Sequence, residues 1–153
     1  MNELQVVVFS LNGQLYGAEA FQVHQIIKYQ EPVKVPNMPS YIDGIIKYRD
    51  SVVPVIDLVS RFDLGKTEIT KKTKIIIAKI DDKMAGFVVN DVNEITKLND
   101  DEIEAAPTIL DGTSGAYLKK VAKKGDDLIS IIDLYTVLDS DEVSELDINV
   151  EEE

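Results

Sequence analysis

Short apolar runs separated by polar turn signals dominate the hydropathy pattern of the chain. The runs are rich in β-branched and aromatic residues and have the length of strands. They cover residues 4–11, 15–20, 42–47, 52–56, 74–80, 84–89, 117–122 and 128–132. Between the first two runs, Asn12-Gly13 is a two-residue signal for a β-hairpin. The pattern predicts a mainly β protein with little helix, of the small-barrel or sandwich kind.

The hydropathy period changes in the segment 21–27. Val23, Ile26 and Ile27 stand at positions i, i+3 and i+4, which is the spacing of one face of a helix. Residues 92–95 show the same spacing more briefly. We therefore expect one or two helical turns in the first segment and a brief helical stretch in the second.

The most informative regularity is an internal duplication. Residues 41–58 align with residues 117–134 without a gap; six of the eighteen positions are identical and six more exchange one aliphatic residue for another. The hairpins that precede these blocks align as well, with Val6-Val7-Val8 over Ile75-Ile76-Ile77, Gly17 over Gly86, Val23 over Val92 and Ile26 over Ile95. One copy alone would bury too little surface to be stable. The duplication therefore predicts two small barrels that share an apolar core.

Charge and residue types narrow the function classes. The 153 residues include 28 Asp and Glu against 16 Lys and Arg, and the formal net charge of −12 disfavours binding to nucleic acid or to anionic membrane surfaces. The chain has no cysteine, which excludes disulfides, thiol nucleophiles and cysteine-ligated metals. Because no glycine-rich phosphate loop and no calcium-loop motif occurs, we expect neither a cofactor nor a metal.

The sequence also bears on location. No apolar run reaches the roughly 18–20 residues of a membrane span, and the start of the chain lacks the features of a signal peptide. We expect a cytoplasmic protein without direct membrane insertion. Eight acidic residues and no Lys or Arg lie in 139–153, which leaves 20 acidic and 16 basic residues in the body. We expect 139–153 to form a flexible, solvated acidic tail.

Three residues could support an enzyme. Asp57 and Asp133 each end the repeated apolar strand, and His24 is the single histidine. Two carboxylates could do acid–base chemistry if they met in space. Equivalent positions of two copies should instead lie at separate strand ends, and each aspartate is well placed to cap a short helix, at 58–61 and 134–137. Capping is the preferred interpretation.

Arg49 stands in the turn between the apolar runs 42–47 and 52–56, and the chain has one other arginine, Arg61. Two interpretations stay open at this point. The side chain can be a solvated turn residue, or it can anchor an interface, since arginine is enriched at binding hot spots.

Taken in order, these motifs resemble the CheW family, the coupling proteins of bacterial chemotaxis. The resemblance rests on Tyr16-Gly17, Val23-x-x-Ile26-Ile27, Val35-Pro36-x-x-Pro39-x-Tyr41-Ile42-x-Gly44-Ile45-Ile46, Arg49-x-x-Val52-Val53-Pro54-Val55-Ile56-Asp57-Leu58, Arg61-Phe62 and Gly86-Phe87-Val88-Val89-x-x-Val92. It extends to about Leu138. It implies a CheW-like domain over 1–138, with two intertwined five-stranded SH3-like barrels around a common core. The two subdomains would cover about 1–70 and 71–138, with some strand exchange.

The resemblance further implies a non-catalytic adaptor without cofactors. It would link the cytoplasmic tips of chemoreceptors to the regulatory domain of the histidine kinase CheA, at receptor arrays beneath the inner membrane. The candidate partner-binding residues are Arg49, Gly44, Val23, Val88, Val92 and Asp57. For the three valines, burial in a core and exposure in a docking groove both stay open.

Two departures and three alternatives accompany this interpretation. Asp50 replaces the glycine of the family's Asn-Leu-Arg-Gly turn, and Gln25 replaces a usual glutamate. The alternatives are a CheW-like paralogue that serves another kinase array, a small acidic enzyme using Asp57, Asp133 and His24, and a CheV-type adaptor. The last would add a phospho-receiver domain, which the residues up to Glu153 do not provide.

Overall fold

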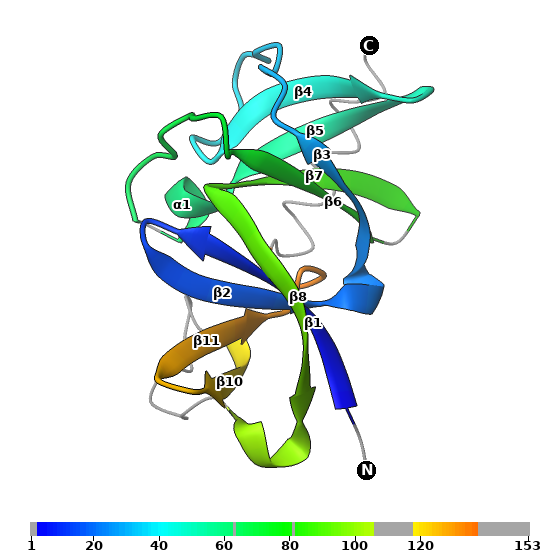
Figure 1. Ribbon diagram of the computed structural model, residues 1–153. Helices are drawn as coiled ribbons and strands as arrows, with labels where there is room; N and C mark the ends of the chain where they lie inside the picture. Colours follow the sequence, from blue (N-terminus) through cyan, green and yellow to red (C-terminus); the bar gives the residue numbers. More distant parts are fainter. Residues whose placement is uncertain (1–2, 63, 81, 106–117, 138–153) are drawn as a thin grey trace.

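The computed structural model describes residues 3–62, 64–80, 82–105 and 118–137, which form strands with very little helix (Figure 1). The first half holds β1 (Glu3–Leu11), β2 (Gln14–Glu19), the 3-10 turn η1 (Ala20–Gln22), β3 (Val23–Lys28), β4 (Ile42–Tyr48), β5 (Ser51–Asp57) and the one-turn helix α1 (Leu58–Arg61). The second half holds β6 (Lys74–Ile80), β7 (Lys83–Val89), β8 (Asp91–Asn99), the 3-10 turn η2 (Asp100–Glu102), β9 (Ile103–Ala105), β10 (Leu118–Lys124) and β11 (Asp127–Ile132). The predicted acidic tail, 139–153, lies outside the described residues.

The strands form two sheets that exchange hairpins. Sheet A has the order β8-β1-β2-β11-β10-β9, and sheet B has the order β3-β6-β7-β5-β4. The hairpin β1–β2 of the first copy thus lies between strands of the second copy, and the hairpin β6–β7 of the second copy lies between strands of the first. Both exchanges close with a parallel pair, β11 on β2 and β5 on β7. Neither sheet is complete without strands from the other copy.

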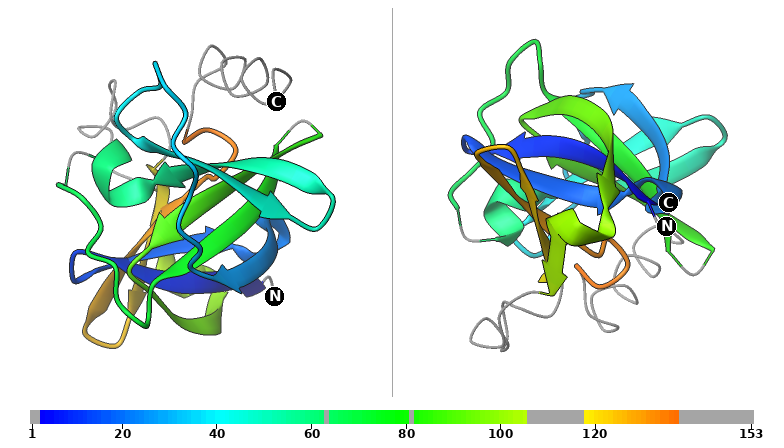
Figure 2. Two further views of the ribbon diagram at one scale, coloured as in Figure 1. Left: turned by 90° about the horizontal axis from the view of Figure 1, so that it is seen from above. Right: turned by 60° about the horizontal axis from the view of Figure 1, so that its bottom comes forward.

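The mainly β, CheW-like architecture with little helix is confirmed. Sheet A has six strands because the short β9 pairs with β10; at the equivalent place in sheet B, Val33 makes an isolated bridge to Ile45. Figure 1 places sheet B above sheet A, and the view from above shows sheet B lying over sheet A (Figure 2). The proposed subdomain boundaries near residue 70 stay a prediction.

Three apolar clusters fill this arrangement. The cluster inside sheet B comprises Ile46, Tyr48, Val53, Val55, Ile75, Ile77 and Val88, and the cluster inside sheet A comprises Val6, Val8, Leu98, Ala122, Ile129 and Ile131. The largest cluster lies between the sheets and takes side chains from both halves, including Phe9, Ile56, Leu58, Phe87, Ile132 and Leu134. Burial of this shared surface joins the two halves, as the duplication predicted.

Two repeat-related glycines occupy the crowded interiors. A Cβ on Gly17 would lie 2.5 Å from Val6 Cγ1, and a Cβ on Gly86 would lie 2.8 Å from Ile75 Cγ2. Both glycines belong to the parallel pairs that close the sheets. Only a residue without a side chain leaves room for these strands to approach.

The helical expectation for 21–27 is wrong beyond its first residues. Only η1 is helical there; Val23 to Lys28 pair with β6, and the register shifts between Val23 and Gln25. The extra residue, His24, forms a bulge that puts Val23 and Ile26 on one face of the strand. A bulged strand thus shows the i, i+3 spacing of a helix.

The second half repeats this bulge. Residues 92–95 are part of β8, whose register with β1 shifts beside Asn93, the repeat equivalent of His24. The bulge puts Val92 and Ile95 on the same face of β8, where they pair with Phe9 and Val7 of β1, respectively. The expectation of a helical stretch at 92–95 is therefore also wrong, for the same reason.

Of the two predicted capped helices, one forms. α1 covers the predicted residues 58–61, with Asp57 as its N-cap. The segment 134–137 is a turn, in which the Thr136 N–H donates to the Asp133 carbonyl at 3.1 Å. Asp133 still caps it locally, because its Oδ1 accepts from the Tyr135 N–H at 2.9 Å.

Candidate functional site

Arg49 lies at the exposed tip of the β4–β5 hairpin, in the left-handed region with φ 56°. A left-handed conformation costs a non-glycine residue on the order of 1 kcal/mol. The repeat equivalent, Gly125, has nearly the same φ of 62°. The first copy therefore keeps a large cationic side chain where the second copy has the residue that suits the backbone.

Neighbouring side chains hold the Arg49 guanidinium in place. Its Cζ lies 5.1 Å from the centroid of the Tyr48 ring, and its Nη2 donates to Gln25 Oε1 at 3.5 Å. The Tyr48 ring also meets His24 edge-on, with centroids 6.3 Å apart. We call these four residues the Arg49 corner. It presents a cation on an aromatic support, an arrangement suited to recognition.

The two departures from the family pattern both lie at this corner. Gln25 presents a neutral amide oxygen to Arg49 in place of a carboxylate, so the guanidinium keeps its charge uncompensated by this neighbour. Of the two central turn residues, Arg49 has a positive φ and Asp50 does not. This pattern is that of a type II′ turn, which does not require glycine at the second position.

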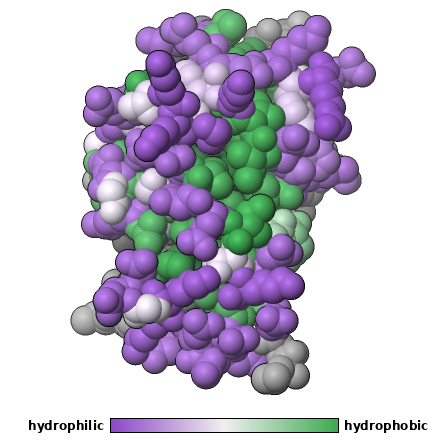
Figure 3. All heavy atoms as spheres, in the orientation of Figure 1, coloured by the Kyte–Doolittle hydropathy of each residue, from purple (hydrophilic) through white to green (hydrophobic). Residues whose placement is uncertain are grey.

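A second surface feature lies on the front of the molecule. Val23 and Ile26 of β3 and Val92 of β8 are partly buried against the core between the sheets, whereas Ile95 of β8 is 57% exposed. β3 is an edge strand of sheet B, and β8 is an edge strand of sheet A. Apolar side chains gather on this face between the two strands (Figure 3). We call these four residues the apolar strip.

The apolar strip follows the duplication. Val23 is equivalent to Val92 and Ile26 to Ile95, and the bulges at His24 and Asn93 turn each pair to one face. β3 runs upward and β8 runs downward in Figure 1. The strip is therefore built from two equivalent, oppositely directed edges. Sequence reasoning named Val23 and Val92 but missed Ile26 and Ile95 as surface residues, although their 69-residue offset was present as a signal.

Three of the six predicted partner-binding residues are not exposed. Val88 is fully buried inside sheet B, so of its two open alternatives the structure places it in the core. Gly44 is buried, and a Cβ on it would lie 2.2 Å from the Val33 carbonyl oxygen. This glycine lets the segment around Val33 bond to both backbone groups of Ile45, at 2.8 and 2.9 Å.

Asp57 is 2% exposed and is fully engaged within the chain. Its Oδ1 accepts from the N–H groups of Val59 and Ser60 and from the Thr67 hydroxyl, at 3.0, 3.3 and 2.6 Å. Its Oδ2 accepts from the Thr67 N–H at 3.1 Å. The carboxylate caps α1 and binds the following loop at Thr67, so its oxygens are not accessible to a partner.

The residues of the enzyme alternative are not brought together. Asp133 accepts from the Gln22 amide at 2.8 Å, and Gln22 in turn accepts from the Leu134 N–H at 2.9 Å. His24 contacts Tyr48. No hydrogen bond or ring contact joins any two of Asp57, Asp133 and His24, so they form no common reaction centre.

Asp43, the unpaired residue where the β4–β5 register shifts between Ile42 and Gly44, is a titratable group that the sequence did not single out. Burial raises the pKa of Asp43 to about 6, and the charge of Asp57 adds to this increase. Lys66 and Lys34 act in the opposite direction on the same pKa. The carboxyl group thus sits in a site that penalises its charge.

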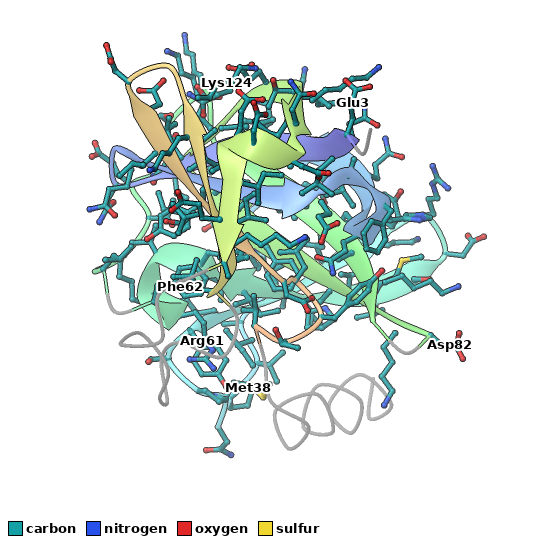
Figure 4. The ribbon with its side chains drawn as sticks, turned by 90° about the horizontal axis from the view of Figure 1, so that it is seen from below. Glu3, Met38, Arg61, Phe62, Asp82 and Lys124 are labelled. Atoms are coloured by element: carbon teal, nitrogen blue, oxygen red, sulfur yellow. The ribbon has the colours of Figure 1, made fainter. Side chains whose placement is uncertain are left out.

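The other arginine, Arg61, lies at a different place. Its Cζ is 5.2 Å from the centroid of the Tyr41 ring, and it extends toward the region of Met38 (Figure 4).

In the part of the chain that the structure describes, no helix has the length and apolar character needed to cross a membrane.

Comparison with known proteins decides the family. The family model of the CheW-like domain matches residues 5–142. This chain belongs to the CheW-like domain family. Among its relatives, the chemotaxis protein CheW of Bacillus subtilis (strain 168) is 36% identical over 137 residues, covering 90% of this chain and 88% of the relative. The chemotaxis protein CheW of Treponema pallidum (strain Nichols) is 24% identical over 148 residues, covering 94% and 87%.

A solved structure agrees with this CheW assignment. The crystal structure of the scaffolding protein TtCheW from Thermoanaerobacter tengcongensis matches with a TM-score of 0.82 and 35% identity, covering 93% of this chain and 92% of that chain. The expected CheW family and fold are confirmed. CheW proteins are non-catalytic chemotaxis scaffolds, so the enzyme alternative is set aside.

Proposed function

We propose that this CheW-like chain is a cytoplasmic adaptor at receptor arrays beneath the inner membrane. It binds the cytoplasmic tip of a chemoreceptor on one surface and the regulatory domain of the kinase CheA on another. An adaptor of this kind needs two docking surfaces that can be occupied at once. The observation that carries the proposal is the apolar strip, a partly exposed apolar face built by two equivalent bulged edge strands.

The apolar strip is assigned to the receptor tip. Two edge strands with apolar side chains between them offer a straight surface of the kind that receives the apolar face of a helix. Val23 and Val92 keep their predicted role here, and Ile26 and Ile95 join them. Contiguous exposed apolar surface on a soluble protein marks an interaction site.

The Arg49 corner is assigned to the kinase regulatory domain. Arg49 is exposed, held by Tyr48 and Gln25, and kept at a backbone position that favours glycine. Backbone strain that persists at an exposed position points to a function for the residue that bears it. Gly44, Val88 and Asp57 contribute to binding indirectly, by holding the strands and loops that carry these surfaces.

Separate binding titrations of the full chain with a receptor-tip fragment and with a CheA regulatory domain test the proposal. Ile95→Glu should weaken receptor binding at least tenfold and leave kinase binding within twofold. Arg49→Gly should do the reverse. Leu128→Glu is the matched control for the strip, since Leu128 is 62% exposed but lies on β11, which β1 and β2 separate from β8.

The outcomes separate the alternatives. If Ile95→Glu and Leu128→Glu behave alike toward the receptor fragment, the strip is not the receptor surface. If the wild-type chain binds the receptor fragment but no CheA domain, it is a paralogue that serves another kinase array.

A further inference from the structure

The apolar strip ends in lysine at both ends. In the β3–β6 pair, Ile26 lies opposite Ile76. Lys28, two residues after Ile26, lies opposite Lys74. Side chains two residues apart share a face of a strand, so Lys28 and Lys74 lie on the face that carries Ile26. By the same argument Lys97, opposite Gln5 on β1, lies on the face that carries Ile95.

Lys28 and Lys97 are also equivalent in the duplication, with the same 69-residue offset as Ile26 and Ile95. Because β3 and β8 run in opposite directions across the front, the two lysines lie at opposite ends of the strip (Figure 1). The space-filling view shows hydrophilic side chains above and below the apolar surface (Figure 3). Both ends of the strip therefore carry a lysine.

These lysines lack ion-pair partners among the described residues. Lys123 is paired with Glu104 at 3.3 Å and Lys124 with Glu94 at 3.9 Å, but Lys28, Lys74 and Lys97 form no ion pair within 4.0 Å of any described acidic residue. Lys74 Nζ donates to the Lys72 carbonyl at 3.1 Å, which leaves its charge in place.

Direct juxtaposition of Lys28 and Lys74 across the β3–β6 pair is itself unfavourable, because like charges opposite one another destabilise a sheet. The chain has a net charge of −12 and therefore contains many acidic residues that could have paired with these lysines. Asp91, at the start of β8 and opposite Ser10, is an acidic residue of that strand but pairs with none of them. The charge at the strip ends is available to a partner.

We propose that the apolar strip receives an amphipathic helix whose apolar stripe carries acidic residues at both ends. This inference rests on the assignment of the strip to a receptor tip and adds the chemistry that would select and orient the helix. Because of its bulge, β3 from Val23 to Lys28 is only as long as its partner segment from Ala78 to Lys74, roughly 13 Å at about 3.3 Å per residue. The strip continues onto β8, so at a rise of about 1.5 Å per residue the two acidic groups must be at least about nine residues apart on the partner helix.

Lysines at the rim of an apolar site act chiefly through long-range charge. They speed encounter and exclude partners of the wrong charge, and their effect falls with added salt. The apolar strip, by contrast, acts by burial and is insensitive to screening. Salt therefore separates the two contributions in one experiment.

The test is titration of the full chain with a receptor-tip fragment at about 50 mM and about 500 mM salt, with the Debye length decreasing from roughly 14 to 4 Å. At low salt, Lys28→Glu and Lys97→Glu should each weaken binding three- to tenfold, and the double variant should lose about the product. At high salt both losses should fall below twofold. Lys123→Glu is the control, since it makes the same charge change at a lysine of β10 away from the strip.

A second set of variants distinguishes this inference from the proposed function. If Ile95→Glu abolishes binding at both salt concentrations while both lysine variants match Lys123→Glu, the strip is the docking site and the acidic-ended helix is wrong. If Ile95→Glu has no effect, the assignment of the strip itself fails. Recovery of Lys28→Glu binding by an acid-to-lysine change on the partner helix would establish the pairing.

Discussion

The β4–β5 and β10–β11 hairpins come from the two copies of the repeat and have closely similar backbones, yet their tips differ. Both place the first central turn residue in the left-handed region, Arg49 at φ 56° and Gly125 at φ 62°. At the preceding position, Tyr48 lies under the Arg49 guanidinium, whereas Lys124 donates to Thr96 and pairs with Glu94. The first tip thus has an exposed cation, Arg49, whereas the cation of the second tip, Lys124, is bound by Thr96 and Glu94.

Below the tips the two hairpins are alike. The inward positions are aliphatic in both copies, and Ile56 and Ile132 enter the same core between the sheets. Packing therefore restricts the interior of each copy to aliphatic residues, whereas the residues at each tip can differ between the copies. Substitutions at the two tips should therefore affect function asymmetrically, and substitutions in the two interiors should affect stability symmetrically.

The largest expected effect tests this symmetry. Ile56→Ala and Ile132→Ala each remove a fully buried side chain from the shared core, and each should lower the free energy of unfolding by about 2–5 kcal/mol. Because each sheet contains strands of both copies, either change should lower one common melting transition. Calorimetry of both variants beside the wild type measures this. Two transitions, each moved by only one of the variants, would show independent barrels.

A smaller effect is expected at the glycines that close the sheets. Gly17→Ala and Gly86→Ala push a methyl group into Val6 and Ile75, respectively, and overpacking of this kind costs about 1–3 kcal/mol. The contact at Gly17 is the closer of the two, 2.5 against 2.8 Å, so Gly17→Ala should be the more destabilising variant. Urea denaturation measures the difference. Gly125→Ala, where a Cβ would meet no atom within 4 Å but φ is +62°, measures the cost of backbone strain without overpacking.

Much of the strand pattern could be predicted from the sequence, because β-branched runs bounded by turn signals behave locally. The Asn12-Gly13 turn has positive φ at both residues, as a two-residue hairpin signal requires. The failures at 21–27 and 92–95 share one physical cause. A bulge shifts the alternation by one residue, and the resulting i, i+3 spacing cannot be told from a short helical face without knowledge of the partner strand.

Hairpin exchange could be anticipated only through the family resemblance. A duplicated hydropathy pattern is satisfied equally well by two self-contained barrels and by two barrels that trade hairpins, since the same residues are buried in both. For the candidate site, the turn position of Arg49 indicated its exposure, but burial of Val88 and Gly44 depends on pairing across sheet B. The lysine ends of the strip could be found from the 69-residue offset once the faces of β3 and β8 were known.

The tip comparison itself predicts a modest, opposite pair of stability changes. Arg49→Gly should raise the free energy of unfolding by about 1 kcal/mol or less, because it relieves a left-handed arginine at the expense of a more flexible unfolded chain. Gly125→Arg should lower it by about the same amount. Thermal melts of the two variants give the signs. A destabilising Arg49→Gly would mean that the contacts with Tyr48 and Gln25 outweigh the backbone cost.

The smallest expected effect concerns Asp43, whose repeat equivalent is a lysine, Lys119. The pKa of Asp43 is raised to about 6 in the folded chain, first by burial and then by the charge of Asp57, from an ordinary value of 3.8. Between about pH 4 and 6 the folded chain holds a proton that the unfolded chain releases. The free energy of unfolding must therefore decrease as the pH rises through this window, and it must level off above it.

Asp43→Asn removes this contribution. Asp43 is only partly buried, so solvent screens the penalty, and the stabilisation of the variant at pH 7 should be below about 1 kcal/mol. Urea denaturation of wild type and variant at half-unit steps from about pH 4 to about pH 7.5 gives the difference between the two curves, in which the other acidic residues cancel. The difference should grow from near zero at pH 4 to a plateau at pH 7. A difference that stays flat with pH would mean that Asp43 is ionised throughout and that its charge is balanced by Lys66 and Lys34.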